Sequence, residues 1–230
     1  MDPRQAILLD WDGTIVDSVP ALFEADTAVC RRLDIPFDRE IFKRAFSPNW
    51  RRMYETLGIA ADQVELAVSV WTETFHSGDT VAFPGVKRAL TRLAACGYLL
   101  GIVTGGSRAS IEPQFERLGL AELLSIRVFG DETTDGKPDP APLLLALERA
   151  GGIEPHDSIY VGDALDDMRM AASAGVAGIG IVSMLADADE LIEAGASSTA
   201  PSVREWVNVL LGPDPDPAEA VPAASREAVL

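Results

Sequence analysis

Short apolar runs alternate with amphipathic stretches along most of this chain. Five of the runs have the length of buried strands: 6–9, 99–103, 126–129, 159–161 and 177–182. Between them, apolar residues recur at helical spacing, and Gly97, Gly151 and Gly175 stand where helices would end. Strands that alternate with helices predict an α/β fold with a doubly wound, Rossmann-like parallel sheet and short crossovers.

One proline disturbs this pattern. Residues 107–118 have helical periodicity, but Pro113 falls inside them. Because proline lacks an N–H and its ring clashes with the preceding turn, we expect a break or an irregular first turn in this helix.

The segment from residue 18 to residue 83 is different, because it has helical periodicity and no strand-like run. Val19–Leu33 predicts a first helix, and Asp38 is a suitable N-cap for a second. Ser47 followed by proline predicts the N-cap and first residue of a third helix, which would end at Gly58. A fourth helix follows before residue 76.

These patterns predict how the chain is divided. Residues 1–17 and 84–211 would form a discontinuous α/β catalytic core, and residues 18–83 an all-helical cap inserted after the first strand. An insertion at that point would lie over the strand ends, as a lid does. Residues 212–230 are rich in proline, alanine and acid, and are expected to form a flexible tail.

Composition limits the choice of partners and location. The chain has 230 residues, is 47% apolar and has a formal net charge of −17, which argues against binding to nucleic acid or to anionic membranes. It has no apolar run long enough for a membrane span and no signal-type N-terminus, so we expect a cytoplasmic protein. Cys30 and Cys96 are expected to be free thiols.

Two carboxylates, Asp10 and Asp12, directly follow the first predicted strand. Side chains at positions i and i+2 of a strand point to the same face, so these two would start close together at the carboxyl end of the sheet. Neighbouring carboxylates repel each other unless a cation or a proton intervenes. Such a pair suits chemistry in which one acid is a nucleophile beside a metal and the other transfers a proton.

Polar groups also follow three other predicted strands. They are the segments Thr104-Gly105-Gly106, Gly136-Lys137-Pro138 and Gly162-Asp163 with Asp166 and Asp167. The carboxyl ends of parallel strands share one edge, so these distant groups should meet there. Lys137 is one of only three lysines in the chain, and glycines after Thr104 would let backbone N–H groups approach an anion.

Together, in this order, these motifs resemble those of the haloacid dehalogenase superfamily of phosphohydrolases. The matching residues are Asp10-x-Asp12-Gly13-Thr14 with Asp17-Ser18, then Thr104, then Lys137 in Gly136-Lys137-Pro138, then Gly162-Asp163-x-x-x-Asp167. The resemblance is strongest to the phosphoglycolate-phosphatase-like branch, which has a helical cap between its first two motifs. It covers roughly residues 6–211.

The resemblance implies a Mg²⁺-dependent phosphatase that hydrolyses a small phosphate monoester. Asp10 would attack phosphorus and form an aspartyl-phosphate, and Asp12 would act as general acid and then general base. Mg²⁺ would be held by the Asp10 carboxylate, the Asp12 backbone carbonyl and Asp163. Asp167 would orient metal-bound water or Lys137. The partner would be a small phosphorylated metabolite, and the sequence does not indicate an oligomeric state.

The resemblance also assigns the phosphate-binding groups. Thr104 and the N–H of Gly105 would hold phosphate oxygens, and Lys137 would neutralise both the nucleophile and the phosphate. Asp166 is expected to be an ordinary first-turn acid of its helix. Ala164 departs from the family pattern, in which serine or threonine is common, and this puts one secondary hydrogen bond in doubt.

Related chemistries remain as alternatives. Asp12 argues against a dehalogenase, which lacks the second aspartate, and against the phosphonate-cleaving branch, in which alanine stands there and in which Lys43 would suggest an imine. Phosphosugar mutases usually have a histidine shortly after the position of Ser18, and this chain has none there. A mutase, a pyrophosphatase on the same fold and a catalytically idle binding protein stay open.

Substrate specificity is the least determined property. Arg51 and Arg52 lie at a helix start in the predicted cap, and Arg108 follows the Thr104 segment. Each is a candidate to meet an anionic leaving group, and the alternative for each is a solvated helix cation.

Overall fold

The computed structural model describes residues 5–75 and 80–214 and contains a six-stranded parallel sheet in the order β3-β2-β1-β4-β5-β6. The strands are β1 (Ala6–Leu9), β2 (Leu99–Val103), β3 (Ile126–Val128), β4 (Ser158–Gly162), β5 (Ala177–Ile181) and β6 (Ser198–Ala200). Strand β1 lies at the centre, and its last residue, Leu9, pairs with Ile102 of β2 and Val161 of β4. The predicted α/β class is confirmed.

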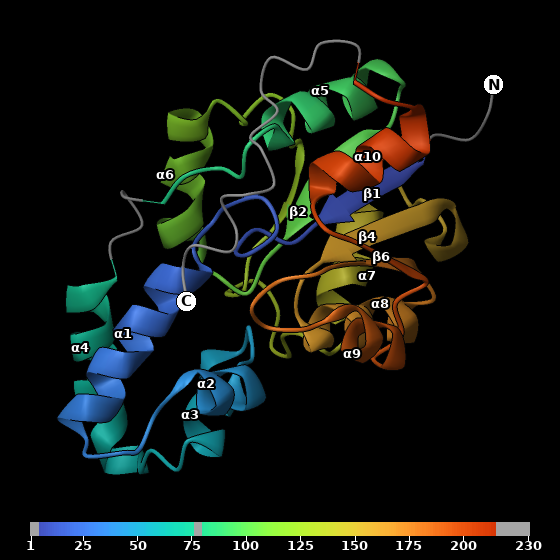
Figure 1. Ribbon diagram of the computed structural model, residues 1–230. Helices are drawn as coiled ribbons and strands as arrows, with labels where there is room; N and C mark the ends of the chain where they lie inside the picture. Colours follow the sequence, from blue (N-terminus) through green and yellow to red (C-terminus); the bar gives the residue numbers. More distant parts are fainter. Residues whose placement is uncertain (1–4, 76–79, 215–230) are drawn as a thin grey trace.

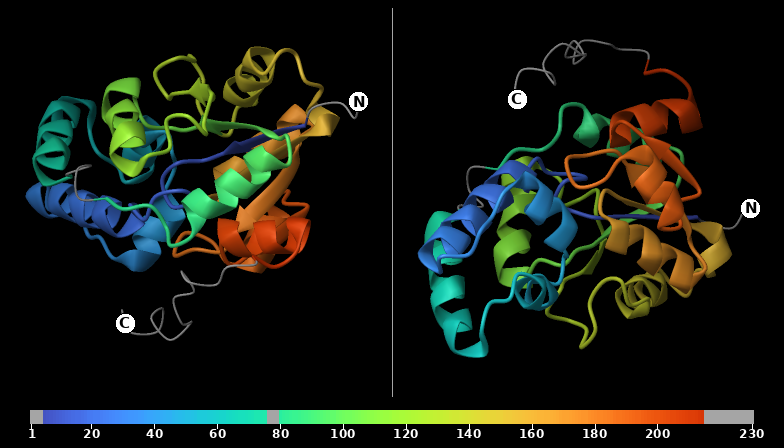
Figure 2. Two further views of the ribbon diagram at one scale, coloured as in Figure 1. Left: turned by 90° about the horizontal axis from the view of Figure 1, so that it is seen from above. Right: turned by 60° about the horizontal axis from the view of Figure 1, so that its bottom comes forward.

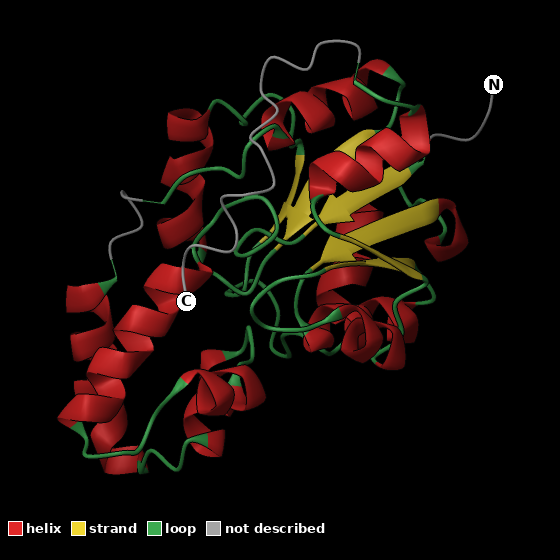
Figure 3. Cartoon of the chain, viewed as in Figure 1, coloured by secondary structure: helices red, strands yellow, loops and turns green. Residues whose placement is uncertain are grey.

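Side-chain alternation in β1 separates two apolar layers. Ile7, Leu9 and Trp11 belong to one buried cluster, and Ala6 and Leu8 belong to the other. Helices α5 (Val86–Ala95), α6 (Arg108–Leu118) and α10 (Val203–Leu211) contribute to the first layer, whereas α7 (Ala141–Arg149), α8 (Leu165–Ala174) and α9 (Ala188–Glu193) contribute to the second. The sheet is therefore covered on both faces, as Figures 1 and 3 show.

The segment after β1 is helical. It contains α1 (Val19–Arg32), α2 (Arg39–Ala45), α3 (Trp50–Thr56), the short helix η1 (Ala61–Gln63) and α4 (Val64–Thr74). Helices α1 and α4 pack side by side. Helices α1 to α4 stand to one side of the sheet, beyond the ends toward which the strand arrows point (Figures 2 and 3). An antiparallel bridge between Val16 and Ala82 brings the two connections to this segment together.

Three details differ from the sequence prediction. Strand β6 was missed because Ser198-Thr199-Ala200 is short and begins with two hydroxyl residues. The break expected at Pro113 is wrong, since α6 is continuous from Arg108 to Leu118. Ile111 and Phe115, on either side of this proline, are buried against the sheet, and their packing holds the helix together across one missing hydrogen bond.

The third difference concerns the start of α3. Its N-cap is Asn49, whose side chain accepts a hydrogen bond from the N–H of Arg51, and not Ser47. The hydroxyl of Ser47 instead donates to Asp166 in the core. The predicted end at Gly58 fits the positive φ of that residue.

Near the end of the described chain, Arg88 of α5 forms an ion pair of 2.5 Å with Asp214. Most of the predicted tail, residues 215–230, lies outside the described residues. Within residues 5–75 and 80–214, no helix is both long enough and apolar enough to cross a membrane.

Candidate active site

The polar segments identified in the sequence follow four adjacent strands of the sheet. Asp10 comes directly after β1, Thr104 after β2 and Asp163 after β4, and all three side chains are buried. Lys137 lies in the connection between β3 and α7 and reaches the same place. The parallel order of β3, β2, β1 and β4 is what brings these distant residues to one edge.

Lys137 is the centre of the charge arrangement. Its Nζ lies 2.5 Å from Oδ1 of Asp10 and 2.7 Å from Oδ1 of Asp167, and its side chain is almost completely buried. Burial opposes the charge on Lys137, but the two carboxylates outweigh it and raise the pKa of the lysine. Lys137 is therefore a cation at neutral pH, held against the acid that follows β1.

Asp10, Asp163 and Asp167 form a compact carboxylate cluster, with one oxygen of each lying within 4.8 Å of the others. Burial raises the pKa of Asp10 to about 7 against the opposing attraction of Lys137. Burial, together with the charges of Asp10 and Asp167, also raises the pKa of Asp163 well above its usual range. One lysine thus does not neutralise the three acids, and the cluster has the composition of a cation site.

The geometry of Asp163 fits such a cation. Its Oδ1 accepts a long hydrogen bond of 3.4 Å from Thr14, whereas Oδ2 is buried and has no hydrogen-bond partner among the residues that the structure describes. Gly13 has φ +79°, and a Cβ there would lie 2.3 Å from Oδ2 of Asp163. The glycine therefore leaves room for the carboxylate, and an oxygen-preferring divalent metal would satisfy its unpaired atom.

Asp167 is fixed by groups on both sides. Its Oδ2 accepts from the N–H of Ala164, and its Oδ1 lies 3.0 Å from the hydroxyl of Tyr160. The Tyr160 hydroxyl lies equally close to the carbonyl oxygen of Val103. The sequence does not predict these contacts of Tyr160, because a tyrosine inside an apolar strand gives no signal of a polar partner.

Asp12 lies apart from the carboxylate cluster. Its Oδ1 accepts a hydrogen bond of 2.6 Å from the hydroxyl of Ser18, which stands at the N-cap of α1 without capping that helix. Burial raises the pKa of Asp12, and the Ser18 hydrogen bond only partly opposes this. Asp12 therefore has a side chain that is predisposed to hold a proton.

The Thr104 segment forms a tight turn beside the inserted helices. Thr104 Oγ1 accepts from the N–H of Gly106 at 3.0 Å, and the N–H of Thr104 bonds to Val128 of β3. At Gly105, a Cβ would lie 2.5 Å from the carbonyl oxygen of Pro48. Glycine is required here because the loop between α2 and α3 approaches so closely.

The three candidate arginines have different surroundings. The guanidinium of Arg51 stacks on Trp50 at 4.4 Å from the ring centroid. The guanidinium of Arg108 forms ion pairs with Glu112 and Glu132. Arg108 therefore has surface partners and is not held by the aspartate cluster of the candidate site.

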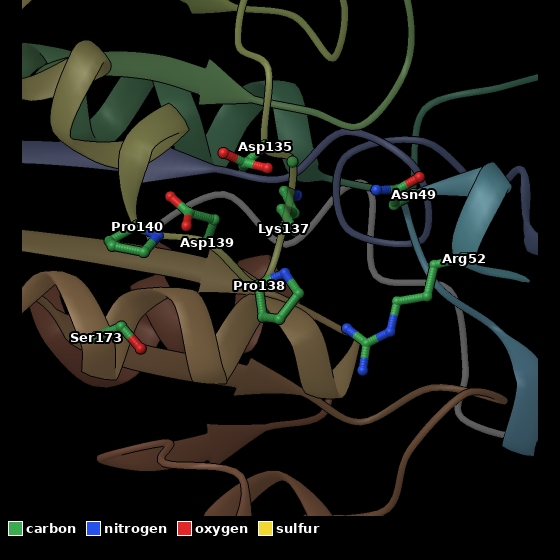
Figure 4. Close-up of a pocket in the computed structure, with 9 residues that line it drawn as sticks. Asn49, Arg52, Asp135, Lys137, Pro138, Asp139, Pro140 and Ser173 are labelled. Carbon is green, nitrogen blue, oxygen red and sulfur yellow. The ribbon is translucent and has the colours of Figure 1, made fainter.

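Arg52 lines an open pocket beside the Lys137 loop. The pocket has a volume of about 430 Å³, and Figure 4 shows Arg52 reaching from α3 toward Pro138. Its other lining residues come from the start of α3, the Lys137 loop and α8: Asn49, Asp135, Gly136, Lys137, Pro138, Asp139, Pro140 and Ser173. Of the three arginines, Arg52 is therefore the one placed at the junction of the inserted helices and the core.

Comparison with known proteins agrees with this geometry. Residues 7–181 match the model of the haloacid dehalogenase-like hydrolase family. The phosphoglycolate phosphatase of Nitrosospira multiformis is 31% identical over 189 residues, which cover 75% of this chain and 81% of the relative. A phosphorylated carbohydrates phosphatase of Thermotoga maritima is 30% identical, with 90% of this chain and 98% of the relative covered.

A solved structure supports the same conclusion for the fold. The crystal structure of a hydrolase from Pseudomonas syringae superposes with a TM-score of 0.80 at 25% identity and covers 90% of this chain and 98% of its own. The similarity therefore extends over both the sheet and the inserted helices.

Proposed function

The chain belongs to the haloacid dehalogenase-like hydrolase family, and from that premise we propose that it is a Mg²⁺-dependent phosphatase of small phosphate monoesters. The observation that carries the proposal is the contact of Lys137 with both Asp10 and Asp167, beside the unpartnered Oδ2 of Asp163. Phosphoryl transfer needs charge neutralisation, which Lys137 beside Asp10 and a metal bound at Oδ2 of Asp163 would supply.

In the proposed reaction, an oxygen of Asp10 attacks phosphorus while the bond from phosphorus to the ester oxygen breaks. Asp12 gives its proton to the leaving oxygen, and its raised pKa supports this role. The same carboxylate then removes a proton from water, which attacks the phosphorus of the aspartyl-phosphate. Inorganic phosphate leaves, and Asp10 is regenerated as a carboxylate that Lys137 stabilises.

The remaining groups bind and orient. Asp10, the backbone carbonyl of Asp12 and Asp163 would hold the metal, which would neutralise phosphate charge when bound. Asp167 keeps Lys137 in place through their 2.7 Å contact. Thr104 and the N–H of Gly105 would hold phosphate oxygens at the turn after β2.

Hydrolysis of p-nitrophenyl phosphate tests this mechanism. Wild type should turn over with Mg²⁺ and stop on chelation, and Asp10→Asn should lose activity by about a thousandfold or more because the nucleophile is gone. Asp12→Ala should also lose steady-state turnover. It should still release one p-nitrophenolate per chain, because that leaving group needs no proton and Asp10 is intact.

The phosphorylated Asp12→Ala variant should show the mass increase of one phosphoryl group. Asp62→Asn, which changes an exposed aspartate of η1, serves as the control and should retain activity. Absence of turnover in wild type would favour an idle binding protein. Full turnover in Asp10→Asn would eliminate the proposed nucleophile.

The substrate is proposed by class. The names of the two relatives point to phosphoglycolate and phosphorylated carbohydrates as the first compounds to measure. A screen of phosphorylated metabolites ranked by kcat/KM identifies the substrate, and detection of a phosphosugar isomer in place of inorganic phosphate would indicate a mutase. Unchanged ranking in Arg52→Ala would exclude that arginine as a specificity residue.

A further inference from the structure

Asp166 belongs to core helix α8, yet its carboxylate bonds to two groups of the inserted helices. Its Oδ2 accepts from the hydroxyl of Ser47 at 3.0 Å and from Nη1 of Arg52 at 3.4 Å. Its Oδ1 accepts from Arg169, one turn further along α8, at 3.0 Å. An ordinary first-turn acid needs none of these contacts, so the side chain has a role beyond its own helix.

Burial makes these bonds consequential. The side chain of Asp166 is 6% exposed, and Ser47 is buried. A buried carboxylate is stable only while its partners are in place. If the inserted helices separated from the core, water would have to replace the hydrogen bonds that Ser47 and Arg52 donate to Asp166. The contact between Lys43 of α2 and Glu190 of α9 is different, because both side chains are about one-third exposed and solvent screens them.

The loop that Asp166 holds also touches two other parts of the candidate site. Pro48 packs closely against Gly105, in the turn that follows β2. Asn49 lies beside Gly136 in the Lys137 loop, and both residues line the pocket together with Arg52. Ser47, Pro48 and Asn49 therefore each lie against a different segment of the core.

Apolar contacts support the same junction. Ala164 and Leu185 of the core belong to one buried cluster with Phe42 and Met53 of the inserted helices. Ala164 directly precedes α8, where the family pattern commonly has serine or threonine. The start of α8 thus offers the inserted helices an apolar contact at Ala164 and a polar one at Asp166.

We infer that Asp166 is a latch that holds the inserted helices closed over the active site through Ser47 and Arg52. It is a positioning residue for the phosphatase reaction, on which this inference rests for its kinetic consequence. Successive helix residues point about 100° apart. Asp167 can therefore serve Lys137 while Asp166 reaches the inserted helices. Arg52, held by the latch, is fixed at the mouth of the pocket.

Hydrogen exchange of the full chain, read by mass spectrometry, tests the latch without any substrate. Asp166→Ala and Ser47→Ala should each raise amide exchange in residues 46–57 and 104–107 by about tenfold, because closed states become less populated. Strands β1 and β4 should not change. Lys43→Met is the matched control, since it breaks only the exposed ion pair with Glu190 between the inserted helices and the core, and it should match wild type.

Kinetics supply the second measurement. With p-nitrophenyl phosphate, Asp166→Ala should raise KM by about tenfold, and Asp166→Asn, which keeps an acceptor for Ser47, should recover part of the loss. The double variant Ser47→Ala/Asp166→Ala should resemble Asp166→Ala alone, because both changes break one bond.

Three results would overturn the latch. They are wild-type exchange in Asp166→Ala and Ser47→Ala, an equal effect of Lys43→Met, and additive effects in the double variant. Should Asp166→Ala fail to fold, Ser47→Ala breaks the same bond from the other side and decides the question. If the protein shows no phosphatase activity, the proposed function fails, while the exchange measurement still decides the latch.

Discussion

Gly13, in the turn after β1, lies next to Oδ2 of Asp163, the oxygen without a hydrogen-bond partner among the described residues. A methyl group at this glycine would lie 2.3 Å from Oδ2 of Asp163, in a backbone conformation with φ +79°. Two separate effects of substitution are therefore expected, a strained backbone and a displaced carboxylate. Gly58 separates them, because its φ is +74° and a Cβ there would meet no atom within 4 Å.

We predict that Gly58→Ala loses roughly 1–2 kcal/mol of stability from the left-handed conformation alone, and that Gly13→Ala loses at least as much. Only Gly13→Ala should also weaken Mg²⁺ binding and phosphatase turnover, by tenfold or more, because Asp163 must move. Denaturant unfolding and a Mg²⁺ titration of each variant measure the two effects. Equal metal affinity in both variants would show that Asp163 is not a ligand.

The positions of the proposed site residues were predictable from the sequence where a polar residue follows a strand. Asp10, Thr104 and Asp163 were predictable because each ends an apolar run, and parallel strands place such ends together. The contacts of Ser47 with Asp166 and of Trp11 with Gln114 were not, because Ser47 and Gln114 do not follow strands and sheet topology does not place them. Tertiary packing alone creates them.

At the scale of elements, most helices and strands followed from periodicity and capping. Asp38 accepts the hydrogen bond from the N–H of Ile41 that is expected of the N-cap of α2. The errors have physical causes. Pro113 is tolerated inside α6 because buried residues hold the helix against the sheet. Ser47 resembles an N-cap in the sequence, but its hydroxyl donates to Asp166, in a distant part of the chain.

The packing of α1 against α4 contains a buried acid that the proposed reaction does not use. Asp26 of α1 is 5% exposed, and burial raises its pKa from the ordinary 3.8 to about 7, with a hydrogen bond from Trp71 of α4 opposing the shift. Because the folded pKa is higher than the unfolded one, folding takes up a proton between these values. This contribution to stability is complete below about pH 4. It is lost as pH rises through about 7.

We therefore predict that Asp26→Asn stabilises the protein at pH 8 relative to wild type, by a few kcal/mol at most, and much less at pH 5. The amide cannot ionise, so the variant avoids placing a charge beside Trp71. Urea unfolding of both proteins at the two pH values gives the double difference, with Asp62→Asn as the exposed control. A difference that does not vary with pH would contradict the raised pKa.

At the scale of the whole molecule, the two connections between sheet and inserted helices meet at one place. The N–H of Asp17 bonds to the carbonyl of Val81, and the N–H of Phe83 bonds to that of Ile15. The inserted helices are thus attached through a paired connection rather than two independent ones. The Asp166 contact is made separately, by the loop between α2 and α3. The proposed closure thus has a pivot, the paired connections at residues 15–17 and 81–83, and a latch at Asp166.

Gln114 of α6 braces this pivot. Its Oε1 lies 3.2 Å from the indole nitrogen of Trp11 and 3.2 Å from the hydroxyl of Thr80, and all three groups are buried. Trp11 lies between the proposed nucleophile and the proposed acid in the chain, and Thr80 lies in the second connection. The side-chain oxygen of Gln114 therefore links α6 to the turn that contains Trp11 and to the second connection at Thr80.

We predict that Gln114→Met, which keeps the side-chain length but removes the acceptor, lowers the free energy of unfolding by about 1–3 kcal/mol, because the buried indole N–H of Trp11 loses this partner. Because Trp11 lies between Asp10 and Asp12 in the chain, loss of its partner should also lower kcat with p-nitrophenyl phosphate, measured at a temperature where both proteins are folded. Glu116→Gln, an exposed change on the same helix, is the control. Wild-type stability and kcat in Gln114→Met would mean that the connections hold their position without this brace.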